Sequence, residues 1–414
     1  MITACVIAAA CGPPRPLQSN AAFDLVVAAT TDVHGRLRGW DYYANAPDSL
    51  RGLSRAATII DSLRKGMSVF PVVVDAGDFL QGNPLAYVAA RVDTEMPHPV
   101  IAAMNAITYD AVVIGNHEFN YGLSTLNRAI RQADFTMLAA NVYTPDGKQP
   151  FRPWAVSTRR GIKIAIVGAT TPGSVLWDRD NLAGRLVIRD VVPEVRTAVR
   201  DARDAGAVVV IVVVHSGLNE PSSYDTVSTR VPSENVAARL AHEVPGIDLL
   251  VYGHSHKEMA DTVIGGTLLM QPRNWATSVA IAHLGIERRD GHWRVTSKRS
   301  TVVATAHHRE NPLVVAVTQE GHRATVKYAT TTIGTTPVAW RADSARVRCA
   351  ARVDRGVLAR RVASRGSDHR GATVGAVSLR QHAARREVVR RPAARVSRAE
   401  RAILSAKRRR ERRR

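Results

Sequence analysis

Apolar runs recur along the first 305 residues of the chain, and many are followed directly by polar residues. Five runs have the length and composition of buried β-strands, at 23–31, 69–76, 109–114, 207–214 and 246–252. Apolar residues at helical spacing lie between them, at 52–64, 123–133, 190–205 and 232–244. Strands that alternate with helices predict an α/β fold with parallel strands.

Three later segments follow one another with only Gly and Asp turns between them, at 266–272, 277–286 and 292–303. We expect them to form consecutive antiparallel strands. The sheets are therefore predicted to be mixed. We expect a four-layer αββα sandwich with helices on both outer faces, and not a purely parallel doubly wound sheet.

A short polar cluster ends each of the five strand-like runs. The clusters are Asp32-Val33-His34, Gly77-Asp78, Gly115-Asn116-His117-Glu118, His215-Ser216-Gly217 and Gly253-His254-Ser255-His256. The carboxyl ends of parallel strands meet at one edge of a sheet, where ligands normally bind in open α/β folds. Carboxylate, amide and imidazole ligands without thiolates suit Mn, Fe, Zn or Co. The pattern indicates a metal-dependent hydrolase with enough ligands for two ions.

The spacing of the ligands suggests how they are shared. Residues i and i+2 of an extended segment face the same side, so Asp32 and His34 are expected to bind one ion together. His254 and His256 have the same spacing and either share an ion or divide between two neighbouring ions. Five other histidines follow no apolar strand and are interpreted as surface residues, namely His98, His242, His292, His307 and His308.

The order DxH, GD, GNHE, HSG and GHSH resembles that of the calcineurin-like metallophosphoesterases. Longer segments are similar to the secreted bacterial 2′,3′-cyclic-nucleotide 2′-phosphodiesterase/3′-nucleotidases and their 5′-nucleotidase relatives, at 30–43, 74–86, 98–122 and 212–218. The similarity extends from about Ala22 to about Val347. It implies a small-molecule nucleotide as substrate.

The resemblance also implies a role for each residue of the predicted site. The first metal would be bound by Asp32, His34 and His256. The second would be bound by Asn116, His215 and His254, with Asp78 bridging the two. Two such ions activate a water as hydroxide and hold the attacking and leaving oxygens. His117 would face the substrate as a charge stabiliser or general acid.

Asn120 separates two branches of these enzymes. Many 5′-nucleotidases resemble GNHEFD, in which an Asp orients the catalytic His, whereas this chain has GNHEFNYG. An Asn can orient His117 through a hydrogen bond but cannot supply a full negative charge. This motif favours hydrolysis of 2′,3′-cyclic and 3′-nucleotides. The alternative is a 5′-nucleotidase or UDP-sugar hydrolase of the same superfamily.

Residues 1–21 form a short apolar leader and a spacer. Small residues stand directly before Cys11, which resembles a bacterial lipoprotein signal, although the positive amino-terminal region of such signals is missing. Export would place the enzyme in the periplasm or cell envelope, with a lipid on Cys11 as its anchor. The alternative is an apolar tail on a cytosolic protein. Because Cys5 and Cys11 lie in the leader, Cys349 has no partner for a disulfide within the mature chain.

The segment 344–414 carries most of the charge. It contains 22 Arg and one Lys against five acidic residues, which gives +18 of the chain's formal net charge of +21. Three interpretations compete: a disordered basic arm that binds nucleic acid or an anionic membrane, a charged helix over 396–414, and an out-of-frame reading of a GC-rich gene, which we favour. The segment lacks aromatic residues that would stack on bases, which argues against nucleic acid.

The predicted domains follow from these boundaries. Residues 22–305 form the dimetal catalytic domain, and 306–343 form a linker helix and the start of a truncated C-terminal nucleotidase domain. The resemblance implies that this second domain binds the nucleoside. We therefore expect weak, broad phosphoesterase activity with a raised KM for nucleotides. A non-catalytic relic or a nucleic-acid-binding protein is the alternative from another class, but all seven ligand positions are filled.

Overall fold

The computed structural model describes residues 22–65 and 69–332. The predicted leader, the predicted tail and the end of the predicted linker lie outside the described residues. The chain divides into two units, Met1–Val326 and Lys327–Arg414. Only the first few residues of the second unit are described, and they include the end of the last helix. No helix within the described residues is long and apolar enough to cross a membrane.

The first sheet has six strands in the order β16-β15-β1-β4-β5-β6. Their bounds are β1 Ala22–Thr30, β4 Val72–Asp75, β5 Ala111–Val113, β6 Thr136–Leu138, β15 Ser278–Arg289 and β16 His292–Ala304. Strands β1, β4, β5 and β6 are parallel, and β15 and β16 add an antiparallel hairpin beside β1. The predicted mixture of parallel and antiparallel pairing is therefore confirmed in this sheet.

The second sheet has the order β13-β14-β12-β11-β9-β8. Its strands are β8 Trp154–Arg159, β9 Ile162–Thr170, β11 Val209–His215, β12 Leu249–Tyr252, β13 Met259–Ile264 and β14 Thr267–Gln271. Strands β9, β11, β12 and β14 are parallel, and an antiparallel strand lies at each edge. Both sheets thus contain four parallel strands whose carboxyl ends can carry ligands.

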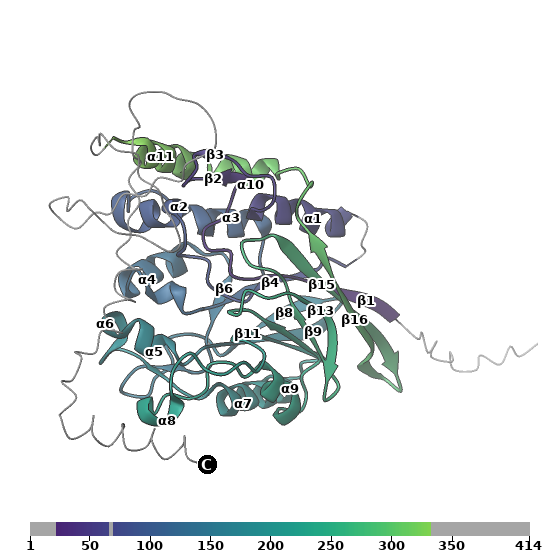
Figure 1. Ribbon diagram of the computed structural model, residues 1–414. Coiled ribbons are helices and arrows are strands. Elements are labelled where there is room, and N and C mark those ends of the chain that lie inside the picture. The colour runs from purple at the N-terminus through teal and green to yellow at the C-terminus, as the bar shows by residue number, and fades with distance from the viewer. Residues whose placement is uncertain (1–21, 66–68, 333–414) are drawn as a thin grey trace, which may run out of the picture. The chain divides into compact units, whose positions relative to one another are not determined.

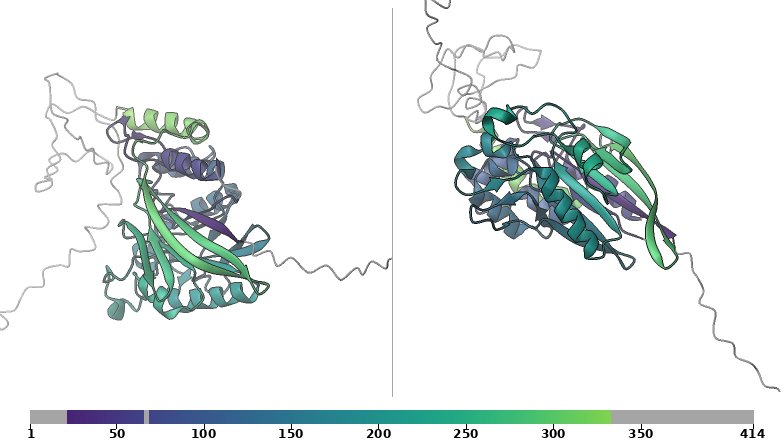
Figure 2. Two further views of the ribbon diagram at one scale, coloured as in Figure 1. Left: turned by 90° about the vertical axis from the view of Figure 1, so that its right-hand side faces the viewer. Right: turned by 90° about the horizontal axis from the view of Figure 1, so that it is seen from below.

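Alternating residues of the strands face different layers. In β1, Leu25 and Val27 pack in the core between the two sheets, whereas Val26 and Ala28 pack against the helices of the first sheet. The helices on that side include α1 Leu53–Lys65, α3 Pro99–Ile107 and α4 Leu123–Gln132. On the outer face of the second sheet lie α7 Val191–Asp204 and α9 Ala237–Glu243. Helices therefore cover both outer faces, as the predicted αββα sandwich requires (Figures 1 and 2).

Local sequence explains where α7 lies and which face it buries. The Asp190 side chain accepts a hydrogen bond from the Val192 N–H group at 3.1 Å and so satisfies a free donor at the start of the helix. Val195, Ala198 and Val199 recur at helical spacing and are buried against the second sheet.

The shorter elements connect these layers. The helices are α2 Pro84–Tyr87, α5 Ser174–Trp177, α6 Arg179–Leu182, α8 Thr226–Thr229, α10 Pro312–Val317 and α11 Gln319–Thr330, with single turns η1 Val88–Val92 and η2 His117–Phe119. The paired short strands are β2 Trp40–Asp41 with β3 Ala46–Pro47, and β7 Val142–Tyr143 with β10 Val187–Ile188. Helices α10 and α11 lie in the segment where the sequence predicts a linker helix.

The prediction of three consecutive antiparallel strands is only partly correct. Strands β15 and β16 form the expected hairpin, but β14 belongs to the other sheet and pairs in parallel with β12. All five residues of β14 are buried, as is typical of an interior strand with both faces covered. Its antiparallel partner is β13, which the sequence analysis missed, and Gly265 and Gly266 form the turn between them.

Candidate functional site

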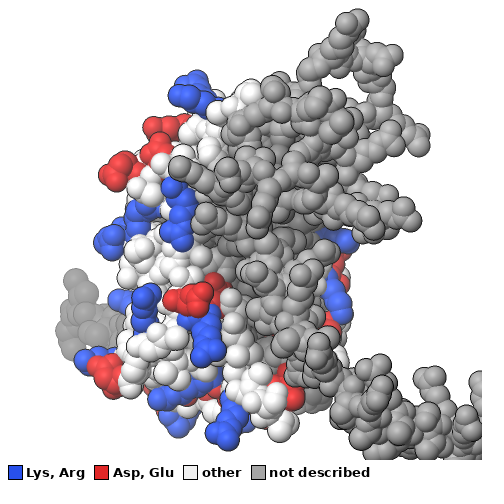
Figure 3. Space-filling model, turned by 60° about the vertical axis from the view of Figure 1, so that its left-hand side comes forward, with Lys and Arg blue, Asp and Glu red and all other residues white. Residues whose placement is uncertain are grey.

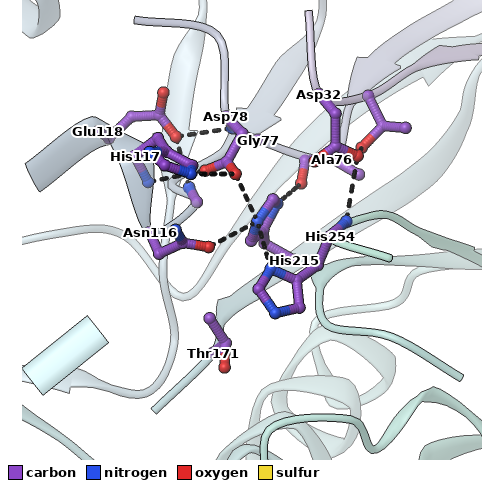
Figure 4. A network of polar contacts seen from close by, with 12 residues as sticks. Asp32, Ala76, Gly77, Asp78, Asn116, His117, Glu118, Thr171, His215 and His254 are labelled. Carbon is purple, nitrogen blue, oxygen red and sulfur yellow. Dashed lines mark hydrogen bonds and ion pairs between the residues drawn. The ribbon is translucent and has the colours of Figure 1, made fainter. Parts of the chain in front are cut away.

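The five predicted clusters meet at the carboxyl edges of the two sheets. Asp32 and His34 follow β1, Asp78 follows β4, Asn116 follows β5, His215 ends β11, and His254 and His256 follow β12. Hydrogen bonds join the sheets here, and two of them involve backbone groups (Figure 4). His215 Nδ1 donates to the Ala76 carbonyl oxygen at 2.7 Å, and the His254 backbone N–H group donates to Asp32 Oδ2 at 3.0 Å.

One group of possible ligands comprises Asp32, His34 and His256, whose ligand atoms all lie within 4.8 Å of one another. The Nε2 atoms of His34 and His256 are 3.1 Å apart, and His256 Nε2 is 3.3 Å from Asp32 Oδ1. Asp32 is fully buried, and its Oδ1 atom has no hydrogen-bond partner within the described part of the chain. A buried carboxylate oxygen in this position is suited to a cation.

A second group comprises Asp78, His215 and His254. His215 Nε2 lies 3.0 Å from Asp78 Oδ2 and 3.2 Å from His254 Nδ1. It also lies 3.1 Å from Asn116 Oδ1. Since Asp78 Oδ2 is also 4.0 Å from His34 Nε2, this carboxylate stands between the two groups. His254 and His256 thus divide between the groups, which is one of the two arrangements that their spacing allows.

The backbone at the site differs from the extended segment expected for Asp32 and His34. Both residues have a left-handed backbone, with φ of 49° and 50°, so the two side chains converge through a turn. Asp78, His254 and His256 also have positive φ, of 62°, 71° and 56°. Non-glycine residues rarely adopt this conformation, and such residues cluster at functional sites.

Outer hydrogen bonds fix which ring nitrogen of each histidine is free. His34 Nδ1 lies 2.7 Å from the Gln81 carbonyl oxygen, and His254 Nε2 lies 2.7 Å from Glu234 Oε1. His215 has the equivalent bond to Ala76. Because those oxygens only accept, each bonded nitrogen carries the hydrogen, and in the neutral ring the other nitrogen presents a lone pair to the cluster. Three lone pairs beside Asp32 and Asp78 form a donor set that fits divalent cations.

The pKa values show that the ligand histidines differ in how readily they take up a proton. Burial lowers the pKa of His215, but the Asp78 carboxylate outweighs it and raises that pKa to about 10. Burial lowers the pKa of His34 to about 4. The pKa of Asp78 is well below its ordinary value despite burial, because His215 and His117 favour the carboxylate. A proton on His215 occupies the position that a cation would take, so metal binding must displace it.

Glu118 connects the loops after β4 and β5. Its buried carboxylate accepts four backbone N–H groups at 2.7–2.9 Å, from Gly115, Asp78, Phe79 and Leu80. Burial and the Asp78 charge raise the pKa of Glu118 to about 7, and the N–H groups oppose that rise. Glu118 therefore holds Asp78 and the GNHE turn in place.

His117 lies beside the two groups on the turn η2. Its Nδ1 atom is 2.5 Å from Asn120 Oδ1, and its Nε2 atom is 3.9 Å from Asp78 Oδ2. The predicted pairing of His117 with Asn120 is therefore present. His117 also forms a third group of possible metal ligands with His34 and Asp78. Its side chain is 29% exposed, and Nε2 is the ring nitrogen on the Asp78 side.

Two carboxylates of the site were missed by the sequence analysis. Glu234 accepts from His254, and Asp178 accepts from Asn120 Nδ2 at 2.8 Å. The apolar run at 162–170 could have located β9, a sixth strand that ends at the same edge, but Asp178 lies further along the chain, between α5 and α6. Glu234 lies in a loop after β11 and carries no such signal.

The five histidines predicted to lie on the surface are not all exposed. His242, His292 and His307 are exposed and His308 is half-buried, but His98 is fully buried. The prediction is wrong for His98 because it sits at the start of α3, where its backbone N–H group donates to Gln132 Oε1. Neither ring nitrogen of His98 has a hydrogen-bond partner within the described segments.

Comparison with known proteins agrees with this geometry. Residues 25–258 match the family model described as calcineurin-like phosphoesterase. The chain is 34% identical over 343 residues to a 2′,3′-cyclic-nucleotide 2′-phosphodiesterase/3′-nucleotidase of Haemophilus influenzae, covering 75% of this chain and 51% of that protein. It is 30% identical over 356 residues to the trifunctional nucleotide phosphoesterase protein YfkN of Bacillus subtilis, covering 78% of this chain and 24% of that protein.

A solved structure shows the same fold. The crystal structure of calcineurin-like phosphoesterase YfkN from Bacillus subtilis superposes with a TM-score of 0.68 at 29% identity, covering 74% of this chain and 99% of that one. The chain spans about half or less of the length of the curated relatives named above. The strand order, the ligand groups and the family match lead to one conclusion: the chain belongs to the calcineurin-like phosphoesterase family.

Proposed function

We propose that this protein is a metal-dependent hydrolase of nucleotide phosphoesters, of the 2′,3′-cyclic phosphodiesterase/3′-nucleotidase type. The observation that carries the proposal is that two ligand groups lie on either side of Asp78, with the Nε2 atom of the partly exposed His117 beside them. The relative from Haemophilus influenzae, whose name specifies these substrates, supports the choice of substrate.

The proposed ligands are those expected from the sequence. Asp32, His34 and His256 would hold the first metal. His215, His254 and Asn116 would hold the second, and Asp78 would contribute to both. When bound, two divalent ions make a water nucleophilic at neutral pH and stabilise charge on the phosphoryl group. Mn, Zn, Fe and Co all accept this set of nitrogen and oxygen ligands.

His117 is the proposed group that meets the substrate directly. Its Nδ1 atom is committed to Asn120, so its Nε2 atom is the one that donates to the phosphoryl or leaving oxygen when the ring is protonated. The half-buried position allows contact with a substrate while limiting access of water. Asn120 acts by holding the ring.

The domain arrangement remains the one proposed from the sequence. Residues 22–305 are the proposed catalytic domain, and the segment 306–343 follows it as a linker. The leader pattern before Cys11 supports a location in the periplasm or cell envelope, with a lipid on Cys11 as the membrane attachment.

Charge on one face of the molecule does not favour nucleic acid as the partner. On the face shown in Figure 3, Lys and Arg are interspersed with Asp and Glu. A groove that follows a nucleic-acid backbone is normally lined with positive charge.

A substrate comparison tests the proposal. Protein freed of metal with a chelator and reloaded with Mn²⁺ should hydrolyse 2′,3′-cyclic AMP and 3′-AMP faster than 5′-AMP or UDP-glucose. It should also hydrolyse bis(p-nitrophenyl) phosphate, and His117→Ala should lose this turnover. Preference for 5′-AMP would instead identify a 5′-nucleotidase. Folded, metal-loaded protein no more active than His117→Ala on any of these esters would refute the proposal.

A further inference from the structure

Asp178 is a buried carboxylate directly behind the turn that carries His117. It is 8% exposed and ends α5. Its Oδ2 atom accepts a hydrogen bond from Asn120 Nδ2 at 2.8 Å, and its Oδ1 atom accepts a longer one from Asn181 Nδ2 at 3.4 Å. Asn181 Nδ2 also donates to the Phe119 carbonyl oxygen at 3.0 Å. Helix α6 is thus fixed to η2 by the same residues that surround Asp178.

The bond to Asp178 determines which way the Asn120 amide faces. An ionised carboxylate accepts hydrogen bonds and cannot donate them, so the NH₂ group of Asn120 must face Asp178. The amide oxygen is then directed at His117 Nδ1, 2.5 Å away. The hydrogen bond to Asp178 is the described contact that sets which end of the Asn120 amide is oxygen and which is nitrogen.

The amide orientation in turn fixes the tautomer of His117. An amide oxygen only accepts, so the hydrogen must be on Nδ1. Nε2 is left on the side of Asp78, at 3.9 Å. A turned amide would present its NH₂ group to Nδ1 and move the hydrogen of the neutral ring to Nε2.

We propose that Asp178 is a positioning residue for phosphoester hydrolysis, which through Asn120 fixes the tautomer and ring orientation of His117. The proposal rests on the proposed function for its reaction and on the hydrogen-bond chain for its geometry. A carboxylate behind the amide also supplies the negative charge that Asn120 lacks. Burial raises the pKa of Asp178, and the Asn120 hydrogen bond and the His117 charge oppose that rise.

The competing explanation is that Asp178 only stabilises the fold around α5 and α6. Four variants separate the two roles: Asp178→Ala, Asp178→Asn, His117→Ala and the double variant His117→Ala/Asp178→Ala. The matched control is Asp180→Ala, which removes the same charge from an exposed position two residues further on, in α6. Asp178→Asn keeps an oxygen that accepts from Asn120 but removes the charge.

Kinetics on the metal-loaded enzyme with 2′,3′-cyclic AMP give the first test. Asp178→Ala should lower kcat about ten-fold or more, with KM and metal content within two-fold of the parent, because only the positioning of His117 changes. Asp178→Asn should retain more activity than Asp178→Ala, and Asp180→Ala should match the parent. In the His117→Ala background, removing Asp178 should have no further effect. An equal loss in both backgrounds, or no loss at all, would overturn the proposal.

A tautomer measurement is independent of activity. In the zinc-loaded protein with ¹⁵N-labelled histidine at pH 8, the His117 signal, assigned by its absence in His117→Ala, should show hydrogen on Nδ1. Asp178→Ala should shift the hydrogen toward Nε2, and Asp178→Asn should not. A parent spectrum with hydrogen on Nε2, or an Asp178→Ala spectrum identical to the parent, would refute the proposed effect of Asp178 on His117 through Asn120. An enzyme with the predicted tautomer but no turnover would count against the proposed function alone.

Discussion

The Nε2 atoms of His34 and His256 lie 3.1 Å apart, although the residues are separated by 222 positions and follow strands of different sheets. His34 Nδ1 donates to the Gln81 carbonyl oxygen, so its Nε2 atom presents a lone pair in the neutral ring. Asp32 Oδ1 lies on the same side, 3.3 Å from His256 Nε2. The two imidazoles and the carboxylate are best explained as ligands directed at a common ion.

Removing His256 should therefore remove one metal. The side chain is 41% exposed, so His256→Ala should leave the fold intact while taking a ligand from the first group. Metal analysis after extensive dialysis should show about two equivalents per chain in the parent and about one in the variant. His283→Ala, on β15 and paired with Asp24, is the control and should keep both. Two equivalents in His256→Ala would contradict the assignment.

Glu118→Gln should destabilise the protein. The carboxylate accepts two N–H groups on each oxygen, and an NH₂ group in place of one oxygen would face two donors. Leaving such buried donors unpaired should cost about 1–3 kcal/mol in the free energy of unfolding. Urea denaturation measures it, with the exposed Glu95→Gln as control. Equal unfolding midpoints for the parent and Glu118→Gln would argue against this role.

Gly82→Ala should weaken the first metal group. An added Cβ atom would lie 2.8 Å from His34 Nδ1 and closer still to the His34 Cβ atom, so the imidazole would have to move. Gly161 also has positive φ but open space around it, and Gly161→Ala isolates the backbone cost, about 1 kcal/mol. Calorimetric titration with Mn²⁺ should show at least about ten-fold weaker binding only in Gly82→Ala. Equal affinities in the two variants would show that His34 does not depend on this glycine.

His98 should make the protein sensitive to acid. Burial, with a smaller contribution from Arg128, lowers the pKa of His98 from an ordinary 6.5 to about 3. Below pH 6.5 His98 binds a proton in the unfolded chain but stays neutral in the folded chain. The free energy of unfolding is therefore unaffected above pH 6.5 and decreases as the pH falls toward 3. His98→Leu should not show this decrease in the free energy of unfolding, because leucine does not titrate.

The difference in unfolding free energy between His98→Leu and the parent should grow by about 2 kcal/mol from pH 7.5 to pH 5. Urea denaturation in the presence of a chelator measures it without a contribution from bound metal. His242→Leu, at an exposed position, is the control and should show no such growth. A difference that stays constant for His98→Leu would show that His98 is not buried in its neutral form.

The sequence was sufficient to predict the αββα layers, because both faces of strands such as β1 and β11 are apolar and the helices between them are amphipathic. The predicted clusters do lie at the carboxyl ends of parallel strands. They are divided between two sheets whose edges meet, which the sequence did not indicate. The sheet to which β14 belongs could not be predicted. A short apolar run fits an interior strand of either sheet, and the choice depends on packing between distant segments.

The inner residues of the site were predictable and their supports were not. Asp32 and His34 stand out by their position after a strand, although they converge through left-handed turns and not an extended segment. Asp178 and Glu234 act from loops whose course is set by tertiary packing. His98 appeared to be a surface residue because helix α3 had not been predicted, so nothing indicated that its start is buried.

Crystals of the full chain soaked in Mn²⁺ would test the central claim most directly, through an anomalous difference map. Two peaks are predicted, one within the group Asp32, His34 and His256 and the other within the group Asp78, His215 and His254. A single peak, or peaks away from both groups in protein that hydrolyses phosphoesters, would contradict a two-metal centre at the meeting edge of the sheets.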